Sequence, residues 1–222
     1  MWPPRTVAIT DHRRLHGRGT GGEDAALVAF VDAMASAGVD AVQVREREWP
    51  DGRLLRVTRA ALGAVQGSTC RVFVNEHAHV AVASGAHGVH LRSTGMPPAR
   101  VRRAWPAHLL IGRSAHAGNT DTDVAGADMV MFGMVFASVS KPPDAPVAGL
   151  QALAAWGQRP GMAPVVAVGG IALDRCAAVH AAGACGIAGI DLFVRAWQQG
   201  PSALAAIVGD VHAVFRDRER AE

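Results

Sequence analysis

The sequence has few of the residues that mark several large classes of protein. Its 222 residues include no tyrosine and only three cysteines, an odd and widely spaced set that is typical of neither a disulfide framework nor a zinc site. Apolar stretches are broken by Gly, Asp or Arg within about ten residues, so we expect no membrane span. The amino terminus has no apolar run behind a basic start, so we expect no secretory signal. These absences predict a cytoplasmic protein with no membrane partner.

The sequence also lacks a large excess of charge of one sign. The net charge is +3, Lys141 is the only lysine, and the arginines form no continuous stripe along the chain. We therefore expect no nucleic-acid partner, whereas a small anionic ligand would suit this balance. The sequence has ten histidines, but those in the most crowded segment lack the helical spacing of a metal site: His77, His79, His87 and His90. We therefore predict no histidine metal site there.

The chain alternates short β-branched runs with longer amphipathic runs. The short runs begin near residues 7, 41, 72, 88, 109, 129, 165 and 186, and the clearest helical patterns cover 24–37, 51–65, 148–157, 172–182 and 202–216. Near-continuous apolar strands predict a parallel sheet covered by helices. Eight such units predict an α/β fold with one domain over residues 1–222, a closed (β/α)8 TIM barrel. An open doubly wound sheet is the alternative, although no G-x-G-x-x-G follows the first run.

Four similar phrases precede strand patterns and carry a glycine in the same place. They lie at residues 37–40, 84–87, 125–128 and 182–185. A glycine there predicts a helix that ends in a left-handed residue before the chain turns into the next strand. Their meaning is structural.

Polar residues follow the predicted strands, where the chemistry of a barrel is found. Arg45 and Arg47 follow the second run and could clamp a phosphate or carboxylate; the alternative is that Arg45 pairs with a strand-end acid such as Glu76. Glycines let the backbone approach a phosphate after the last two runs, so we predict phosphate binding at Gly169, Gly170, Gly189 and Ile190. The alternative is that these are turn glycines only.

The order of several motifs resembles a known superfamily. They are Ala8-Ile9-Thr10-Asp11, Val42 to Arg47, Gly88-Val89-His90-Leu91, Ile111 to His116, Ala127 to Phe136, and Val166 to Ile171. Over about residues 6–215 the chain resembles the thiamine phosphate synthase/TenI superfamily of small TIM barrels. The resemblance implies one of two activities. The synthase joins a pyrimidine pyrophosphate to a thiazole phosphate with Mg²⁺, and the TenI branch contains thiazole tautomerases that need no metal or cofactor.

Two departures from the synthase pattern favour the TenI branch. Gln43 and Arg45 match the synthase pattern after the second strand, but Arg47 stands where a lysine is expected. Asn75 is followed by Glu76, and His90-Leu91 runs into Arg92 with no acid, whereas synthases place a second acid there to hold Mg²⁺. We therefore predict a tautomerase, an isomerase that acts on a thiazole phosphate without a metal.

Two other segments bear on the same choice. Ser138, Ser140 and Lys141 keep the hydroxyls and the lysine of the synthase loop, which predicts anion binding and keeps the synthase as the alternative. A solvated loop is the structural alternative for these residues. Ser114 and His116 lie in a motif similar to that of TenI proteins, and we predict His116 as the general acid/base, with Gln43, Asn75 and Ser114 at the substrate. His116 could instead only orient the ligand.

Asp191 departs from both branches, which usually have a small hydroxyl residue at this place. As a helix N-cap, Asp191 would occupy the amides that a phosphate needs and would repel it. This residue favours a third alternative, a non-catalytic metabolite-binding or regulatory barrel. We also expect a homodimer, and a lid formed by residues 11–14 and the glycine-rich stretch 17–22.

Overall fold

Eight parallel strands close into a barrel in the computed structural model, which describes residues 2–15, 21–138, 142 and 144–216. Each strand pairs with its neighbours in chain order, and the last pairs with the first. The strands are β1 (Thr6–Ile9), β2 (Ala41–Val44), β3 (Arg71–Asn75), β4 (Gly88–Leu91), β5 (Leu110–Ala115), β6 (Met129–Gly133), β7 (Val165–Val168) and β8 (Gly186–Gly189). The predicted (β/α)8 barrel is confirmed, and the open sheet is excluded.

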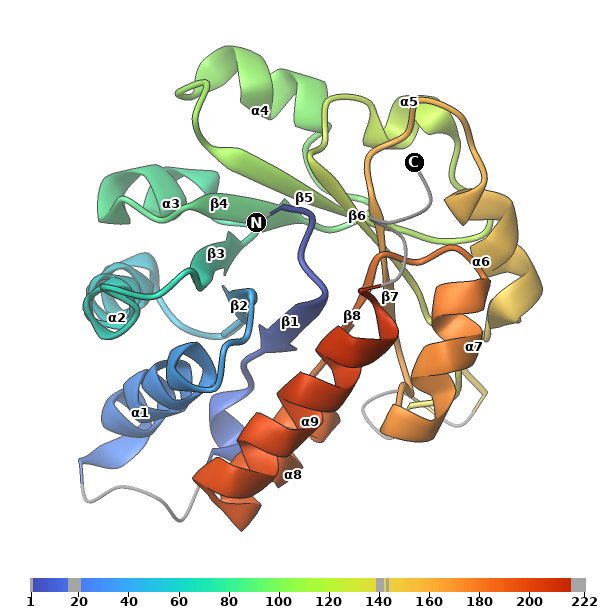
Figure 1. The fold of residues 1–222 in the computed structure, drawn as a ribbon. Helices are drawn as coiled ribbons and strands as arrows, with labels where there is room; N and C mark the ends of the chain where they lie inside the picture. The colour runs from blue at the N-terminus through green and yellow to red at the C-terminus, as the bar shows by residue number, and fades with distance from the viewer. Residues whose placement is uncertain (1, 16–20, 139–141, 143, 217–222) are drawn as a thin grey trace.

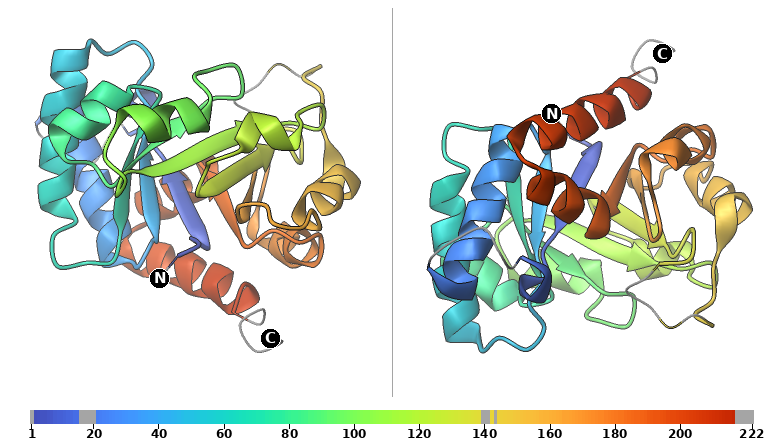
Figure 2. Two further views of the ribbon diagram at one scale, coloured as in Figure 1. Left: turned by 90° about the horizontal axis from the view of Figure 1, so that it is seen from above. Right: turned by 90° about the horizontal axis from the view of Figure 1, so that it is seen from below.

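Helices surround this barrel on the outside (Figures 1 and 2). Those that match the predicted patterns within a few residues are α1 (Gly22–Ser36), α2 (Asp51–Ala64), α6 (Gly149–Gly157), α7 (Cys176–Ala181) and α9 (Pro201–Val214). The prediction missed α3 (Ala78–Ser84), α4 (Pro98–Ala104), α5 (Asp121–Val124) and α8 (Asp191–Gln199). Short 3-10 helices, η1 (His12–Arg14) and η2 (Leu173–Arg175), precede α1 and α7. Of the helices in the described part, none is both long and apolar enough to cross a bilayer.

The pleat of the strands divides the core into an inner and an outer layer. In β1, Val7 and Ile9 belong to the cluster inside the barrel, whereas Ala8 packs outward with the helices. Phe73 fills the interior, and the ring of Trp2 stacks on it with centroids 5.7 Å apart. Because both faces of each strand are buried, near-continuous apolar runs are needed, as the sequence has.

The glycine phrases form the predicted turns. Gly38, Gly85, Gly126 and Gly183 all have positive φ, between 80° and 96°, and each precedes a strand. This backbone conformation is costly for other residues, so glycine is needed in the turn that leads from each helix into the next strand.

Candidate functional site

A cavity of about 350 Å³ lies where the carboxyl ends of the strands meet. Because all eight strands are parallel, the residues that follow them converge on this one rim. Every predicted site residue within the described part of the chain lines the cavity: Gln43, Arg45, Arg47, Asn75, Ser114, His116, Ser138, Gly169, Gly170, Gly189 and Ile190. Ser140 and Lys141 lie outside the described residues. The geometry gathers these residues, and their individual roles stay predictions.

Arg45 is a half-buried cation that faces the cavity. Its pKa is lowered, first because burial removes water from the guanidinium and second because Arg47 lies nearby. Glu76, the acid expected as its alternative partner, instead accepts a bond from Arg92 Nε at 2.6 Å. Among the described residues no acid forms an ion pair with Arg45. The chain therefore presents this charge to a ligand rather than using it to close the barrel.

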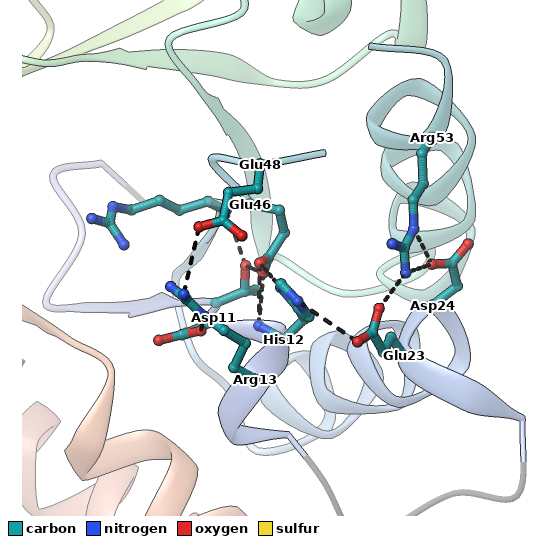
Figure 3. A network of polar contacts seen from close by, with 10 residues as sticks. Asp11, His12, Arg13, Glu23, Asp24, Glu46, Glu48 and Arg53 are labelled. Carbon is teal, nitrogen blue, oxygen red and sulfur yellow. Dashed lines mark hydrogen bonds and ion pairs between the residues drawn. The ribbon is translucent and has the colours of Figure 1, made fainter. Parts of the chain in front are cut away.

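Glu46, the next residue, is fully engaged within the protein (Figure 3). It is buried, and one carboxylate oxygen accepts a hydrogen bond from Thr10 Oγ1 at 2.5 Å. The other oxygen lies 2.7 Å from Nδ1 of His12, and both oxygens accept from the His12 main-chain N–H. A buried carboxylate costs several kcal/mol unless it is satisfied in this way. Glu46 therefore fixes η1 against the end of β2.

The same network continues away from the cavity toward α1 and α2. His12 packs on the ring of Trp49 at 5.2 Å and lies 3.7 Å from Glu23, which also pairs with Arg53. Residues 11–14, the first half of the predicted lid, are thus held through His12, which contacts Glu46 after β2, the ring of Trp49 and Glu23 in α1. Of the other half of that prediction, residues 17–22, residues 17–20 lie outside the described part and Gly22 is the first residue of α1.

Two side-chain pairs span neighbouring strands at the floor of the cavity. Gln43 Nε2 donates to Asn75 Oδ1 at 2.8 Å, which fixes the orientation of both amides. His90 Nε2 lies 2.8 Å from Ser114 Oγ, and burial, with Arg113 and Arg45 nearby, lowers the pKa of His90 to about 3. His90 is therefore neutral at physiological pH. From the sequence, His90 is considered only as a metal ligand and is given no role in the site, although its place near the end of β4 brings it to the cavity.

His116 lies just beyond β5 on the exposed part of the rim. Its Nδ1 bonds to the carbonyl oxygen of Gly133, and its main-chain N–H donates to Asn119 Oδ1 at 2.8 Å. Because a carbonyl only accepts, Nδ1 carries the proton and Nε2 is the nitrogen left for a ligand. This arrangement orients the ring, and it suits either role that was predicted for His116.

The glycines after β7 and β8 differ in what requires them. Gly170 has φ of 60°, and a side chain there would collide with the backbone of Phe136 and Ala137. A Cβ at Gly189 would meet no atom within 4 Å. Packing therefore explains Gly170, whereas the protein itself does not require Gly189, which leaves open space at the cavity.

The expected N-cap role of Asp191 is wrong. Ile190 occupies the N-cap of α8 without a side-chain cap bond, and Asp191 is the first helical residue. Its carboxylate forms an ion pair with Arg14. Because this charge is paired and leaves the first amides of α8 uncapped, the N-cap contact that favoured a non-catalytic barrel is absent, although Asp191 itself lines the cavity.

Two groups of potential metal ligands come together in the described residues. Asp51, His77 and His79 have donor atoms within 4.8 Å of one another, so the two histidines meet through an acid from another element rather than through helical spacing. The second group, Asp11, His12 and Glu46, lines the cavity. Its imidazole is already engaged with Glu46.

The donors at the cavity do not fit Mg²⁺, which requires several oxygen ligands. At the ends of β3 and β4 the described cavity lining offers one carboxylate, Glu76, and Arg92 is bonded to it at 2.6 Å. The group that contains His12 offers an imidazole in place of a third oxygen.

Comparisons with known proteins agree on one family and cover most of the chain. The model of the TMP-TENI family, described as thiamine monophosphate synthase, matches residues 8–193. A thiamine-phosphate synthase from Anaeromyxobacter dehalogenans is 40% identical over 81% of this chain and 80% of the relative. One from Laribacter hongkongensis is 37% identical over 76% and 79%. A solved thiamine phosphate pyrophosphorylase from Pyrococcus furiosus has a TM-score of 0.74 at 28% identity, covering 93% of this chain and 96% of that one.

These relatives overturn the tautomerase prediction. They are named as synthases, which are transferases, so the isomerase class and the expectation of a metal-free tautomerase are both wrong, and the alternative fits. Arg47 and the missing acid beyond Leu91 misled the prediction because they were read as marks of another reaction.

Proposed function

The chain belongs to the thiamine monophosphate synthase family, and from this premise we propose that it is a transferase. Its substrates would be a pyrimidine pyrophosphate and a thiazole phosphate, the small-molecule partner already expected. A bond forms between the two ring systems, and the bond from the pyrimidine side to pyrophosphate breaks. Pyrophosphate leaves with the bonding electrons, so the reaction needs no oxidant or reductant.

The observation that carries this proposal is Arg45, which lines a cavity that glycines after β7 and β8 also line and has no ion-pair partner among the described residues. A half-buried guanidinium of this kind suits a phosphate, to which it can donate two parallel N–H bonds. Gly189 and the uncapped start of α8 leave space and amide donors for a second phosphate. Two phosphorylated substrates can thus be held at two places on one rim, after β2 and after β8, which both flank β1.

The neutral groups at the ends of β2, β3 and β5 would hold the rings. The amides of Gln43 and Asn75 are fixed by their mutual bond, and each retains a polar atom for a heterocycle edge. Ser114 is held by neutral His90 in the same way. His116 would orient the substrate or move a proton through Nε2.

The family resemblance implies that Mg²⁺ would neutralise the departing pyrophosphate. The donors of this chain do not fit such an ion, so no step is assigned to it here. A homodimer and a cytoplasmic location are part of the same proposal, as is the lack of a nucleic-acid partner.

The test is an end-point assay of the purified chain with both substrates and Mg²⁺, with thiamine phosphate as the product measured. We expect product only when both substrates are present. Product that forms equally fast without the protein, or that fails to form with it, would contradict the proposal.

A further inference from the structure

We propose that Arg92 binds the pyrophosphate group in this cavity and supplies the positive charge for which the family pattern uses a divalent cation. This inference rests on the proposed function, because it names the residue that meets the leaving group. It implies that the chain binds pyrophosphate without a metal.

The charged side chains that line the cavity differ in whether they have an ion-pair partner. Each lining carboxylate has a basic partner: Asp11 and Glu48 with Arg13, Glu46 with His12, Glu76 with Arg92, and Asp191 with Arg14. Arg45 and Arg47 have no ion-pair partner among the residues that the structure describes. Arg45 and Arg47 therefore leave two cationic groups at the end of β2 available to an anion, whereas the lining as a whole, with five carboxylates and four arginines, has no excess of positive charge.

Arg92 lies where a metal ligand would be needed. Its Nε bonds to Glu76 Oε1 at 2.6 Å, and its side chain is 66% exposed against 25% for Glu76. The guanidinium thus keeps exposed N–H groups while one edge is held by the acid. An arginine with this geometry can donate its remaining N–H groups to phosphate oxygens.

Glu76 is itself held in an unusual conformation. Its φ is 63°, in the left-handed region that non-glycine residues seldom adopt, and its N–H donates to the carbonyl of His90 at 2.8 Å. Residues kept in such conformations gather at functional sites, where the surrounding structure fixes them. Glu76 therefore gives Arg92 a fixed anchor between β3 and β4.

The loop that carries Arg92 is also held. Arg113 comes from β5, is 3% exposed, and donates to the carbonyls of Ser93 and Met96, each at 2.9 Å. These are charge-assisted bonds from a buried side chain, so Arg113 fixes the loop after β4 against β5. Arg92 is therefore presented to the cavity by an anchored segment.

Gly95, beside Glu76, is a further feature that disfavours a metal ion in the loop after β4. A Cβ at Gly95 would lie 3.2 Å from Glu76 Oε1, so a side chain at this position would stand beside the carboxylate. Glycine leaves that place without a second acid. The adjacent Arg92 adds a positive charge, which repels a cation.

The first test measures the affinity of the full chain for inorganic pyrophosphate in EDTA by titration calorimetry. We expect wild-type protein to bind, and Arg92→Ala to bind roughly tenfold more weakly through loss of a charge-assisted contact. Arg103→Ala is the matched control, because Arg103 is exposed on α4 and does not line the cavity. Binding by the wild type only after Mg²⁺ is added, or unchanged binding by Arg92→Ala, would overturn the inference.

The second test asks whether the cavity can be converted to a metal site. The double variant Arg92→Ala/Gly95→Asp removes the cation and places a second carboxylate beside Glu76. We expect it to bind Mn²⁺, seen by electron paramagnetic resonance, and to need the metal for pyrophosphate binding. Mn²⁺ bound by the wild type and released by Glu76→Gln would contradict the inference, as would a folded double variant without metal affinity.

The two proposals fail in different ways. If pyrophosphate binds in EDTA through Arg92 but no thiamine phosphate forms under any condition, the proposed function is wrong and the binding site stands. If thiamine phosphate forms only with Mg²⁺ and pyrophosphate binding also needs the metal, the function stands and the role of Arg92 is wrong.

Discussion

Arg45 and Glu46 are neighbours at the end of β2, yet the structure treats their charges in opposite ways. Glu46 is buried and bonded to Thr10 and His12, whereas Arg45 is half-buried and has no ion-pair partner in the described part of the chain. The comparison separates charges that maintain the shape of the cavity from charges available to a ligand. Residue type and position in the sequence do not make this distinction.

The comparison extends to the two sides of the cavity. Near the start of η1, acids and bases bond to one another: Asp11 pairs with Arg13, and Glu46, His12, Glu23 and Arg53 form a chain of contacts (Figure 3). On the β2–β4 side, Arg45 and Arg47 have no ion-pair partner within the described ranges, and Arg92 is bonded to Glu76 through Nε. Substitutions on the first side should therefore change stability, and those on the second side should change activity.

The largest expected effect is on activity, from Arg45→Ala. Loss of an unpaired, partly desolvated cation that binds phosphate should lower kcat/KM for thiamine phosphate formation roughly a hundredfold. Urea unfolding should be nearly unchanged, because no partner in the described chain is left unsatisfied. Arg103→Ala serves as the control, and a wild-type kcat/KM in Arg45→Ala would remove this residue from the site.

Glu46→Gln should show the reverse pattern. The neutral amide weakens the bonds from His12 and Thr10 in a buried place, so the free energy of unfolding should fall by about 2 kcal/mol. Activity of the folded protein at low temperature should stay within a few-fold of wild type. If activity collapses while the unfolding midpoint stays fixed, Glu46 belongs with the ligand-binding charges.

His90 tests a third kind of group, one that is buried and neutral. Because its folded pKa, about 3, lies below its ordinary value, the unfolded state binds more protons, and its contribution is present above about pH 6.5 and lost as pH falls toward 3. Acidification from pH 6.5 to 5 should cost about 2 kcal/mol of unfolding free energy through this residue. His90→Gln, which can still bond to Ser114, should flatten that part of the profile. An equally steep profile in the variant would assign the titration to another group.

The smallest effect is expected at the glycines. Gly189→Ala should leave stability within about 0.5 kcal/mol of wild type, because the added Cβ meets no protein atom. It should still raise KM for the thiazole phosphate several-fold by occupying ligand space. Gly170→Ala is the comparison, since its positive φ and contact with Ala137 predict lower stability. Unchanged KM in Gly189→Ala would place the phosphate elsewhere.

Much of the fold could be predicted from the sequence because burial on both faces requires a near-continuous apolar run in each strand. The short α3 escaped because Val80 and Val82 alternate as they would in a strand, and α5, with four residues, is too short to show a period. At the site, parallel strands guaranteed that Arg45, Asn75 and Ser114 would meet at one rim.

Pairing between distant residues could not be predicted in the same way. Arg14 and Asp191 are 177 positions apart, and nothing local to Asp191 distinguishes an N-cap from a first-turn residue with a distant arginine. The choice of Arg92 rather than Arg45 as the partner of Glu76 depends on how Arg113 holds the loop after β4. The choice of reaction failed for another reason, since Arg92 in place of an acid was interpreted as evidence against a synthase, which the relatives contradict.

The most direct measurement follows pyrophosphate release and thiamine phosphate formation together in one reaction of the wild-type chain. The account predicts one pyrophosphate for each thiamine phosphate, with neither product when the thiazole phosphate is left out. Pyrophosphate released without the thiazole phosphate would make the protein a hydrolase, and no release with both substrates present would contradict the transferase.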